Sequence, residues 1–158
     1  MKHTIGVVME NKPGVLSRIS TLLARRNFNI YSITAGPKRD NQITRMTVVV
    51  EGDEYVADNA AAELAKFEDV SEIERMTATD SASREIVLIK VNVGVKERSE
   101  LIDLAKVMGA GVVDVTGTTL MLEYSDTPEK IDVMIELLSS YDVLDMARGG
   151  AIALRTGD

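Results

Sequence analysis

The chain has 158 residues, of which 45% are apolar and 27% are charged. This balance is typical of a soluble globular protein with room for one ordinary domain or two small ones. No apolar run reaches the roughly 20 residues of a membrane span, and the N-terminal segment lacks the long apolar region of a signal peptide, so we expect neither. The absence of cysteine excludes disulfides and thiolate metal sites, and it fits a cytoplasmic location.

A net charge of −7 and an aromatic content of 4% argue against nucleic acid as a partner. Phosphate contacts need clustered lysines and arginines, and base stacking needs aromatic rings. His3 is the single histidine, so we expect it at the surface or at a strand end rather than in a metal site or a catalytic relay. The acidic residues between Asp53 and Glu72 are spread around a helix and its flanks, which favours a solvated face over a metal cluster.

The first half of the chain predicts the element order β-α-β-β-α-β, which is the ferredoxin-like arrangement. Strands are predicted from β-branched and alternating runs, and helices from apolar residues at helical spacing. The expected elements are a strand at Thr4–Met9, a turn at Glu10–Gly14, a helix from Val15, strands at Phe28–Gly36 and Ile43–Glu51 around a hairpin loop at Pro37–Asn41, a helix from Gly52 to Phe67, and a strand at Val70–Met76.

The small polar residues Thr77–Ser83 predict a linker and a possible hinge, after which the same order returns. The expected elements are a strand at Glu85–Val93, a helix at Ser99–Met108, strands at Gly111–Thr116 and Thr119–Tyr124, a helix at Pro128–Ser140, and a strand from Val143 that turns at Gly149-Gly150 and runs to Leu154. We therefore predict an α+β protein of two tandem ferredoxin-like βαββαβ domains, each an antiparallel sheet with helices on one face. The domains are residues 1–77 and 84–158, joined by a linker at 78–83.

The two halves can be aligned as a duplication of one fold. The alignment places Ile5 on Ile86, Asn11 on Asn92, and, after a shorter second hairpin, Arg75 on Arg148. If the halves share a fold, the positions at which they differ are candidates for function.

The turn Asn11-Lys12-Pro13-Gly14 has the chemistry of a helix start that can bind an anion. Asn11 could cap through its side chain, Pro13 suits the first helical turn, and Gly14 lets a ligand approach the backbone. Exposed N–H groups and the helix dipole favour a carboxylate or phosphate there. The aligned second half has Val95 in place of Gly14 and Ala110 in place of Asn29, which predicts one ligand-competent unit and one divergent unit. The plain alternative is that these residues only start a helix and finish a turn.

The segment from Glu10 to Arg18, Glu-Asn-Lys-Pro-Gly-Val-Leu-Ser-Arg, resembles the strand-to-helix signature of ACT domains, which are small amino-acid-sensing modules. Asn27-Phe28-Asn29-Ile30-Tyr31-Ser32-Ile33 and Thr44-Arg45-Met46-Thr47 extend the resemblance to the regulatory small subunits of acetolactate synthase, also called acetohydroxyacid synthase. Arg84–Val91, Val113–Thr116 and Met146–Gly150 in the second half are also similar to that family, so the resemblance covers nearly the whole chain.

The resemblance implies a regulatory subunit without catalytic residues, metal or cofactor of its own. It implies that thiamine diphosphate, magnesium and FAD are bound by a catalytic large subunit, which the small subunit activates. It also implies an ACT homodimer that binds a branched-chain amino acid, usually valine, and mediates feedback inhibition. The implied effector-binding residues are Asn11, Pro13, Gly14, Val15 and Leu16 of one chain with Asn29 and Ile30 of the facing chain.

Three other readings stay open from the residues. The first is a stand-alone amino-acid-sensing ACT protein that regulates another enzyme. The second is an enzyme on the same fold, using Arg18 or Arg98, although no nucleophile–base pair is visible in the sequence. The third is an RNA-recognition module, which would need aromatic side chains on a central strand where residues 46–50 have none.

Overall fold

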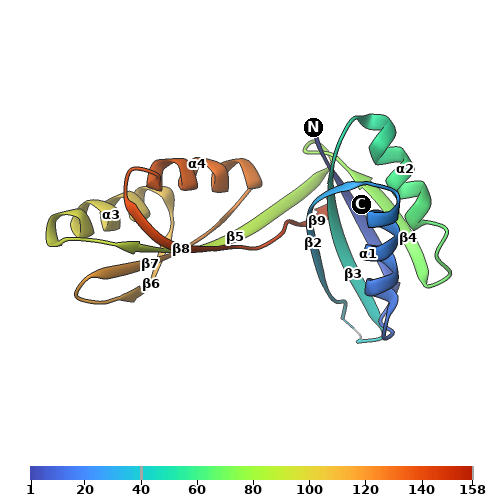
Figure 1. Cartoon of the computed structure of the whole chain (residues 1–158), viewed down its shortest axis with the longest axis horizontal. Coiled ribbons are helices and arrows are strands. Elements are labelled where there is room, and N and C mark those ends of the chain that lie inside the picture. Colours follow the sequence, from blue (N-terminus) through green and yellow to red (C-terminus); the bar gives the residue numbers. More distant parts are fainter. Residues whose placement is uncertain (40, 158) are drawn as a thin grey trace. The chain divides into compact units, whose positions relative to one another are not determined.

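The computed structural model describes residues 1–39 and 41–157, which form two compact units (Figure 1). Unit 1 contains residues 1–83 together with the C-terminal residues from Gly150 onward, and unit 2 contains Arg84–Gly149. Within the described residues, no helix is long and apolar enough to cross a membrane.

Unit 1 is built on a four-stranded antiparallel sheet in the order β2-β3-β1-β4, with two helices. Its elements are β1 (Lys2–Glu10), α1 (Val15–Arg25), β2 (Asn29–Pro37), β3 (Ile43–Glu51), α2 (Glu54–Leu64) and β4 (Val70–Met76). Alternate residues of β1 and β3 form one core with the buried faces of both helices, which places α1 and α2 on the same face of the sheet. The fully buried members of this core include Ile5, Val7, Ile19, Val48 and Leu64.

The opposite face of this sheet is covered by the C-terminal segment of the chain. Strand β9 (Ile152–Arg155) contacts β1, β3 and β4, and its Ala153 is 4% exposed. The Ala153 N–H donates to Oγ1 of Thr47 over 3.3 Å, and the Thr156 N–H donates to the carbonyl of Asp80 over 2.9 Å. Val8 and Val49, the apolar residues of β1 and β3 on this face, are 4% and 5% exposed.

Unit 2 repeats the arrangement with its strands in the order β6-β7-β5-β8. Its elements are β5 (Ser81–Asn92), whose first residues belong to unit 1, α3 (Val95–Met108), β6 (Gly111–Val115), β7 (Thr119–Asp126), α4 (Pro128–Leu138) and β8 (Asp142–Arg148). Val87, Ile89 and Val91 of β5 form the core with Leu122 and Met134.

The predicted fold class is confirmed: both units have the ferredoxin-like order, and most element bounds agree within a few residues. The structure differs in three places. Helix α3 begins at Val95 instead of Ser99, the predicted linker contributes a hydrogen-bonded turn and the start of β5, and the residues after Gly149 belong to unit 1 instead of the second domain. In the hairpin loop expected at Pro37–Asn41, Pro37 ends β2, and Asp40 lies outside the described residues.

The strand register also corrects the alignment of the two halves. Ile5 is fully buried and pairs with Arg75, and the residue of β5 that is fully buried and pairs with Arg148 is Val87. Ile86, which the sequence alignment placed on Ile5, is 44% exposed. The alignment of β1 on β5 was therefore wrong by one residue, and a slip of one residue exchanges the two faces of a strand.

Candidate functional site

The loop of residues 11–14 joins the end of β1 to the start of α1. The Asn11 N–H donates to the carbonyl of Gln42, and its side-chain Nδ2 donates to the carbonyl of Asn41, each over 2.7 Å. These two bonds attach the loop to the connection between β2 and β3. The prediction that Asn11 caps α1 is therefore wrong, because its amide is used in another direction.

Gly14 is the N-cap residue of α1 and has a φ of 86°, in the left-handed region that favours glycine. A Cβ built on Gly14 would meet no atom within 4 Å, so the backbone is open to an approaching ligand. No side chain caps this helix, and the Val15 N–H donates to the carbonyl of Lys12 over 3.4 Å. The N–H groups that follow in the first turn have no acceptor within the helix. Pro13 lies before the N-cap, and its predicted place in the first helical turn is wrong.

A hollow of about 220 Å³ lies against this loop. It is lined by Met9, Glu10, Asn11, Lys12, Val15, Leu16, Ala35, Gly36, Pro37 and Thr44. The apolar side chains can hold an aliphatic group, while the Asn11 amide and the charged residues supply polar contacts. The volume is below the ~300–1,000 Å³ of pockets for drug-sized ligands, which suits a molecule as small as one amino acid.

Four charged side chains surround the loop and form what we call the loop charge cluster: Glu10, Lys12, Arg18 and Asp69. Lys12 contacts the Glu10 carboxylate and lies 3.9 Å from Oδ1 of Asp69, and Arg18 binds Oδ2 of Asp69. The hydrogen bond to Glu10 is the main reason that the pKa of Lys12 is raised. Sequence reasoning missed this cluster and assigned Asp69 to a solvated face, since nothing local predicts a contact between α1 and the turn before β4.

Asn29 and Ile30 lie at the other end of the same sheet. Asn29 pairs with Glu51 at the end of β3, whereas Pro37, beside the hollow, pairs with Thr44. At ~3.3 Å per residue the length of β2 separates these two ends by about 26 Å. Within one chain, the structure therefore does not bring Asn29 and Ile30 together with Asn11, Pro13, Gly14, Val15 and Leu16.

Asn29 instead lines a separate hollow of about 460 Å³. Its Nδ2 donates to Oε2 of Glu51 over 2.6 Å. The amide oxygen of Asn29 is the atom of this side chain that can accept a hydrogen bond from a ligand.

The corresponding loop of unit 2 is shorter, with only residues 93 and 94 between β5 and α3. Its N-cap is Gly94, with a φ of −74° and an N–H that donates to Oε2 of Glu97 over 2.8 Å. The prediction that this half lacks a glycine at the helix start is therefore wrong. The counterpart of Asn29 is Gly111, not Ala110, because Ala110 and Phe28 make the same turn bond after their helices and each precedes a strand.

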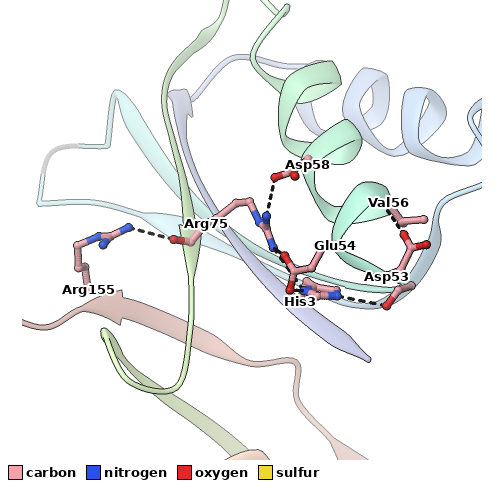
Figure 2. A network of polar contacts seen from close by, with 8 residues as sticks. His3, Asp53, Glu54, Val56, Asp58, Arg75 and Arg155 are labelled. Carbon is pink, nitrogen blue, oxygen red and sulfur yellow. Dashed lines mark hydrogen bonds and ion pairs between the residues drawn. The ribbon is translucent and has the colours of Figure 1, made fainter.

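A second polar network ties the start of β1 to α2 and β4 (Figure 2). His3, the second residue of β1, lies at a strand end as expected but is only 8% exposed, and its Nε2 lies 3.2 Å from the carbonyl of Gly52. Arg75 binds Glu54 and Asp58, and its carbonyl accepts a hydrogen bond from Arg155 over 2.9 Å. No group of three or more acidic, histidine or cysteine side chains in the described part of the chain could hold a metal ion.

Comparisons with known proteins cover both units. Residues 5–72 match the family model described as an acetohydroxyacid synthase small subunit-like ACT domain, and residues 84–157 match the model for the small subunit of acetolactate synthase. The chain is 37% identical to a probable acetolactate synthase small subunit of Archaeoglobus fulgidus, over 100% of this chain and 99% of that protein. It is 35% identical to the acetolactate synthase small subunit of Mycolicibacterium smegmatis, over 98% of this chain and 91% of that protein.

A solved structure is similar over the whole chain. It is the crystal structure of the small subunit of acetolactate synthase from Thermotoga maritima, with a TM-score of 0.91 and 27% sequence identity. The match covers 100% of this chain and 99% of that chain.

Proposed function

The chain belongs to the family of acetolactate synthase small subunits, and from this premise we propose that it is a non-catalytic subunit that binds a branched-chain amino acid and transmits feedback inhibition to the catalytic large subunit. Family membership implies a large subunit as partner. The identity of the effector, the inhibition and the activation of the large subunit are our proposal.

The observation that carries the proposal is the hollow beside residues 11–14. Val15 and Leu16 line it with apolar side chains, and the helix start that they follow has no side-chain cap and an open backbone at Gly14. Helix N–H groups are suited to the carboxylate of an amino acid, and the apolar lining is suited to an aliphatic side chain. We propose valine as the effector. Discrimination from leucine and isoleucine will be incomplete, because one methylene is worth only ~1–3 kcal/mol.

We propose that the site is completed by a second copy of the chain. The ammonium group of an amino acid needs acceptors, and Asn29 offers its amide oxygen at the far end of β2. A two-fold arrangement of two chains would bring the hollow of one chain to Asn29 and Ile30 of the other, with two equivalent sites in each dimer. The separation of these residues within one chain supports this arrangement.

The catalytic chemistry belongs to the large subunit in this proposal. We place thiamine diphosphate, magnesium and FAD there, and we assign no cofactor to this chain. Unit 2 is our candidate for contact with the large subunit. The alternative of a stand-alone amino-acid sensor is disfavoured, because similarity to the small subunits extends over both units.

Calorimetric titration of valine, leucine and isoleucine into the purified chain tests the effector. We expect heat of binding for at least valine, and Asn11→Ala should weaken binding at least tenfold, since a lost hydrogen bond to a charged group costs about 1.5–3 kcal/mol. Asn92→Ala is a matched control at the end of β5, where the amide binds Asp142, and it should bind as the wild type does. No heat from any of the three amino acids would refute the effector, and unchanged binding by Asn11→Ala would refute the site.

A further inference from the structure

The last residue of the first strand differs between the two units. In unit 2, Asn92 ends β5, and its Nδ2 donates to Oδ2 of Asp142 over 2.8 Å. In unit 1, the register places Glu10 at the same position, beside Asp69, whose carbonyl accepts the Glu10 N–H over 2.9 Å. An amide–carboxylate hydrogen bond in unit 2 is therefore replaced by two neighbouring carboxylates in unit 1, which repel each other unless cations intervene.

Two cations occupy this place in unit 1. Lys12 contacts Glu10 and lies 3.9 Å from Asp69, and Arg18 binds Asp69 from the first turns of α1. The side chain of Asp69 is 14% exposed, whereas that of Arg18 is 58% exposed. Water therefore solvates the Asp69 carboxylate poorly, and the guanidinium of Arg18 compensates its negative charge. The complete loop charge cluster contains two acids and two bases and is formally neutral.

Helix α1 itself does not require this contact from Arg18. Arg98 has the same place in α3, since Arg18 and Arg98 each donate their N–H to the carbonyl of the N-cap glycine, Gly14 or Gly94. The Arg98 side chain donates to the carbonyl of Gly117, whereas Asp142 accepts its hydrogen bond from Asn92. An arginine at this helical position therefore binds the carboxylate only in the unit whose loop lines the candidate site.

Glu10 and Lys12 line the hollow, so the charge of the cluster acts on any ion bound there. We propose that Arg18 is a positioning residue for the effector, acting through Asp69. Because Arg18 neutralises Asp69, Lys12 stays paired with Glu10. The loop charge cluster then has no net charge that would repel the carboxylate of the effector. Without Arg18 the cluster has a net charge of −1, and Lys12 is drawn between two carboxylates. This inference rests on the proposed function.

The test is a titration of valine into the wild type, Arg18→Gln, Arg18→Lys, Asp69→Asn and the double variant Arg18→Gln with Asp69→Asn. We expect Arg18→Gln to bind roughly three- to tenfold more weakly, because one unit of negative charge is left near the ligand carboxylate. Arg18→Lys should stay within about twofold of the wild type, since it keeps the charge. The double variant should bind valine with an affinity within about twofold of the wild type. The loss of affinity in Arg18→Gln should become smaller as salt screens the charge. Arg98→Gln is the control in α3 and should not change binding.

A merely structural clamp predicts a different pattern. Asp69→Asn alone would then weaken binding as much as Arg18→Gln, the double variant would not recover, and added salt would not reduce the deficit. Any of these results, or unchanged binding by Arg18→Gln, overturns the inference while the wild type still binds valine. If the wild type binds none of the three branched-chain amino acids, the proposed function fails and this inference falls with it.

Discussion

Gly36 lines the candidate hollow, and Gly14 lies in the adjoining loop of residues 11–14. A Cβ on either would meet no atom within 4 Å, but only Gly14 has a positive φ, of 86°. We expect Gly14→Ala to lower the stability of unit 1 by about 1 kcal/mol, because alanine is strained in the left-handed region, and Gly36→Ala to stay within about 0.5 kcal/mol. Hydrogen exchange of the β1 and β3 amides measures both changes. Equal effects of the two substitutions would contradict this assignment.

The fourth strand of each unit has one arginine at the same position, Arg75 in β4 and Arg148 in β8. The two arginines differ in how exposed their carboxylate partners are. Arg148 binds Glu85, whose side chain is 1% exposed, whereas Arg75 binds Glu54 and Asp58, which are 68% and 66% exposed. We expect Arg148→Met to destabilise unit 2 by about 3–5 kcal/mol, because it strands a buried carboxylate. Arg75→Met should cost unit 1 much less, since water can solvate its partners.

Thermal unfolding and hydrogen exchange of the two variants compare these costs unit by unit. The double variant Glu85→Gln with Arg148→Met separates charge burial from packing. Most of the lost stability should return, because the uncompensated charge has been removed. If the double variant is no more stable than Arg148→Met, the loss comes from packing and the explanation by charge is wrong.

At the scale of elements, the sequence predicts what is encoded locally. Apolar periodicity placed α1 and α4 correctly, and β-branched runs placed β1 and β3, because these patterns follow from which face each element buries. The start of α3 was missed since Val95 is 82% exposed and adds nothing to an apolar stripe. The predicted cap of Asn11 was wrong because the partner of its side chain, the carbonyl of Asn41, lies in the connection between β2 and β3. Contacts between distant segments, such as that of Arg18 with Asp69, have no local signal.

Strand β9 is the element that sequence reasoning assigned to the wrong unit, and its two faces provide a test. Ala153 is 4% exposed against the sheet of unit 1, and the next residue, Leu154, is 58% exposed. Ala153→Asp would bury a charge without a partner and should release β9, lowering the stability of unit 1 by several kcal/mol. Leu154→Asp should be nearly neutral. The readout is protection of the Thr47 and Val49 amides from exchange, and similar protection in both variants would contradict the docking of β9.

The turn before β5 contains a carboxylate, Asp80, whose hydrogen bond to Thr77 predicts a pH-dependent contribution to stability. The N–H of Thr77 donates to Asp80 over 2.6 Å, which lowers the pKa of Asp80, and Arg155 lowers that pKa further. Since the folded pKa lies below the ordinary value of 3.8, this stabilisation is present above pH ~4 and is lost as pH falls through the folded pKa. Unfolding measured between pH 5 and pH 2.5 should therefore show a smaller loss of stability in Asp80→Asn than in the wild type. Parallel curves would contradict this role.

At the scale of the whole molecule, the two units share one fold, but side chains at equivalent positions make different contacts. Each unit has an N-cap glycine and an arginine one turn into the first helix. Each also has an aspartate where the fourth strand begins, Asp69 just before β4 and Asp142 as the first residue of β8. In unit 1, the longer loop of residues 11–14 lies beside the hollow, and Glu10, at the position of Asn92, belongs to the loop charge cluster. The choice of unit 1 as the effector-binding unit stays a prediction, and the two differences from which the sequence alignment argued it, at Val95 and Ala110, change with the corrected register.

The proposed composite site predicts complementation between two defective chains. Asn11→Ala and Asn29→Ala should each abolish most effector binding, because each removes one half of both sites in a homodimer. A mixed dimer of the two variants has one site with Asn11 and Asn29 both intact and one site with both altered. After equilibration of an equal mixture, half of the dimers are mixed, so about a quarter of the wild-type binding sites should return with wild-type affinity. Calorimetry of the mixture and of each variant alone measures this recovery. A site formed within one chain would give no recovery on mixing, and that result would refute the assembly of the site from two chains.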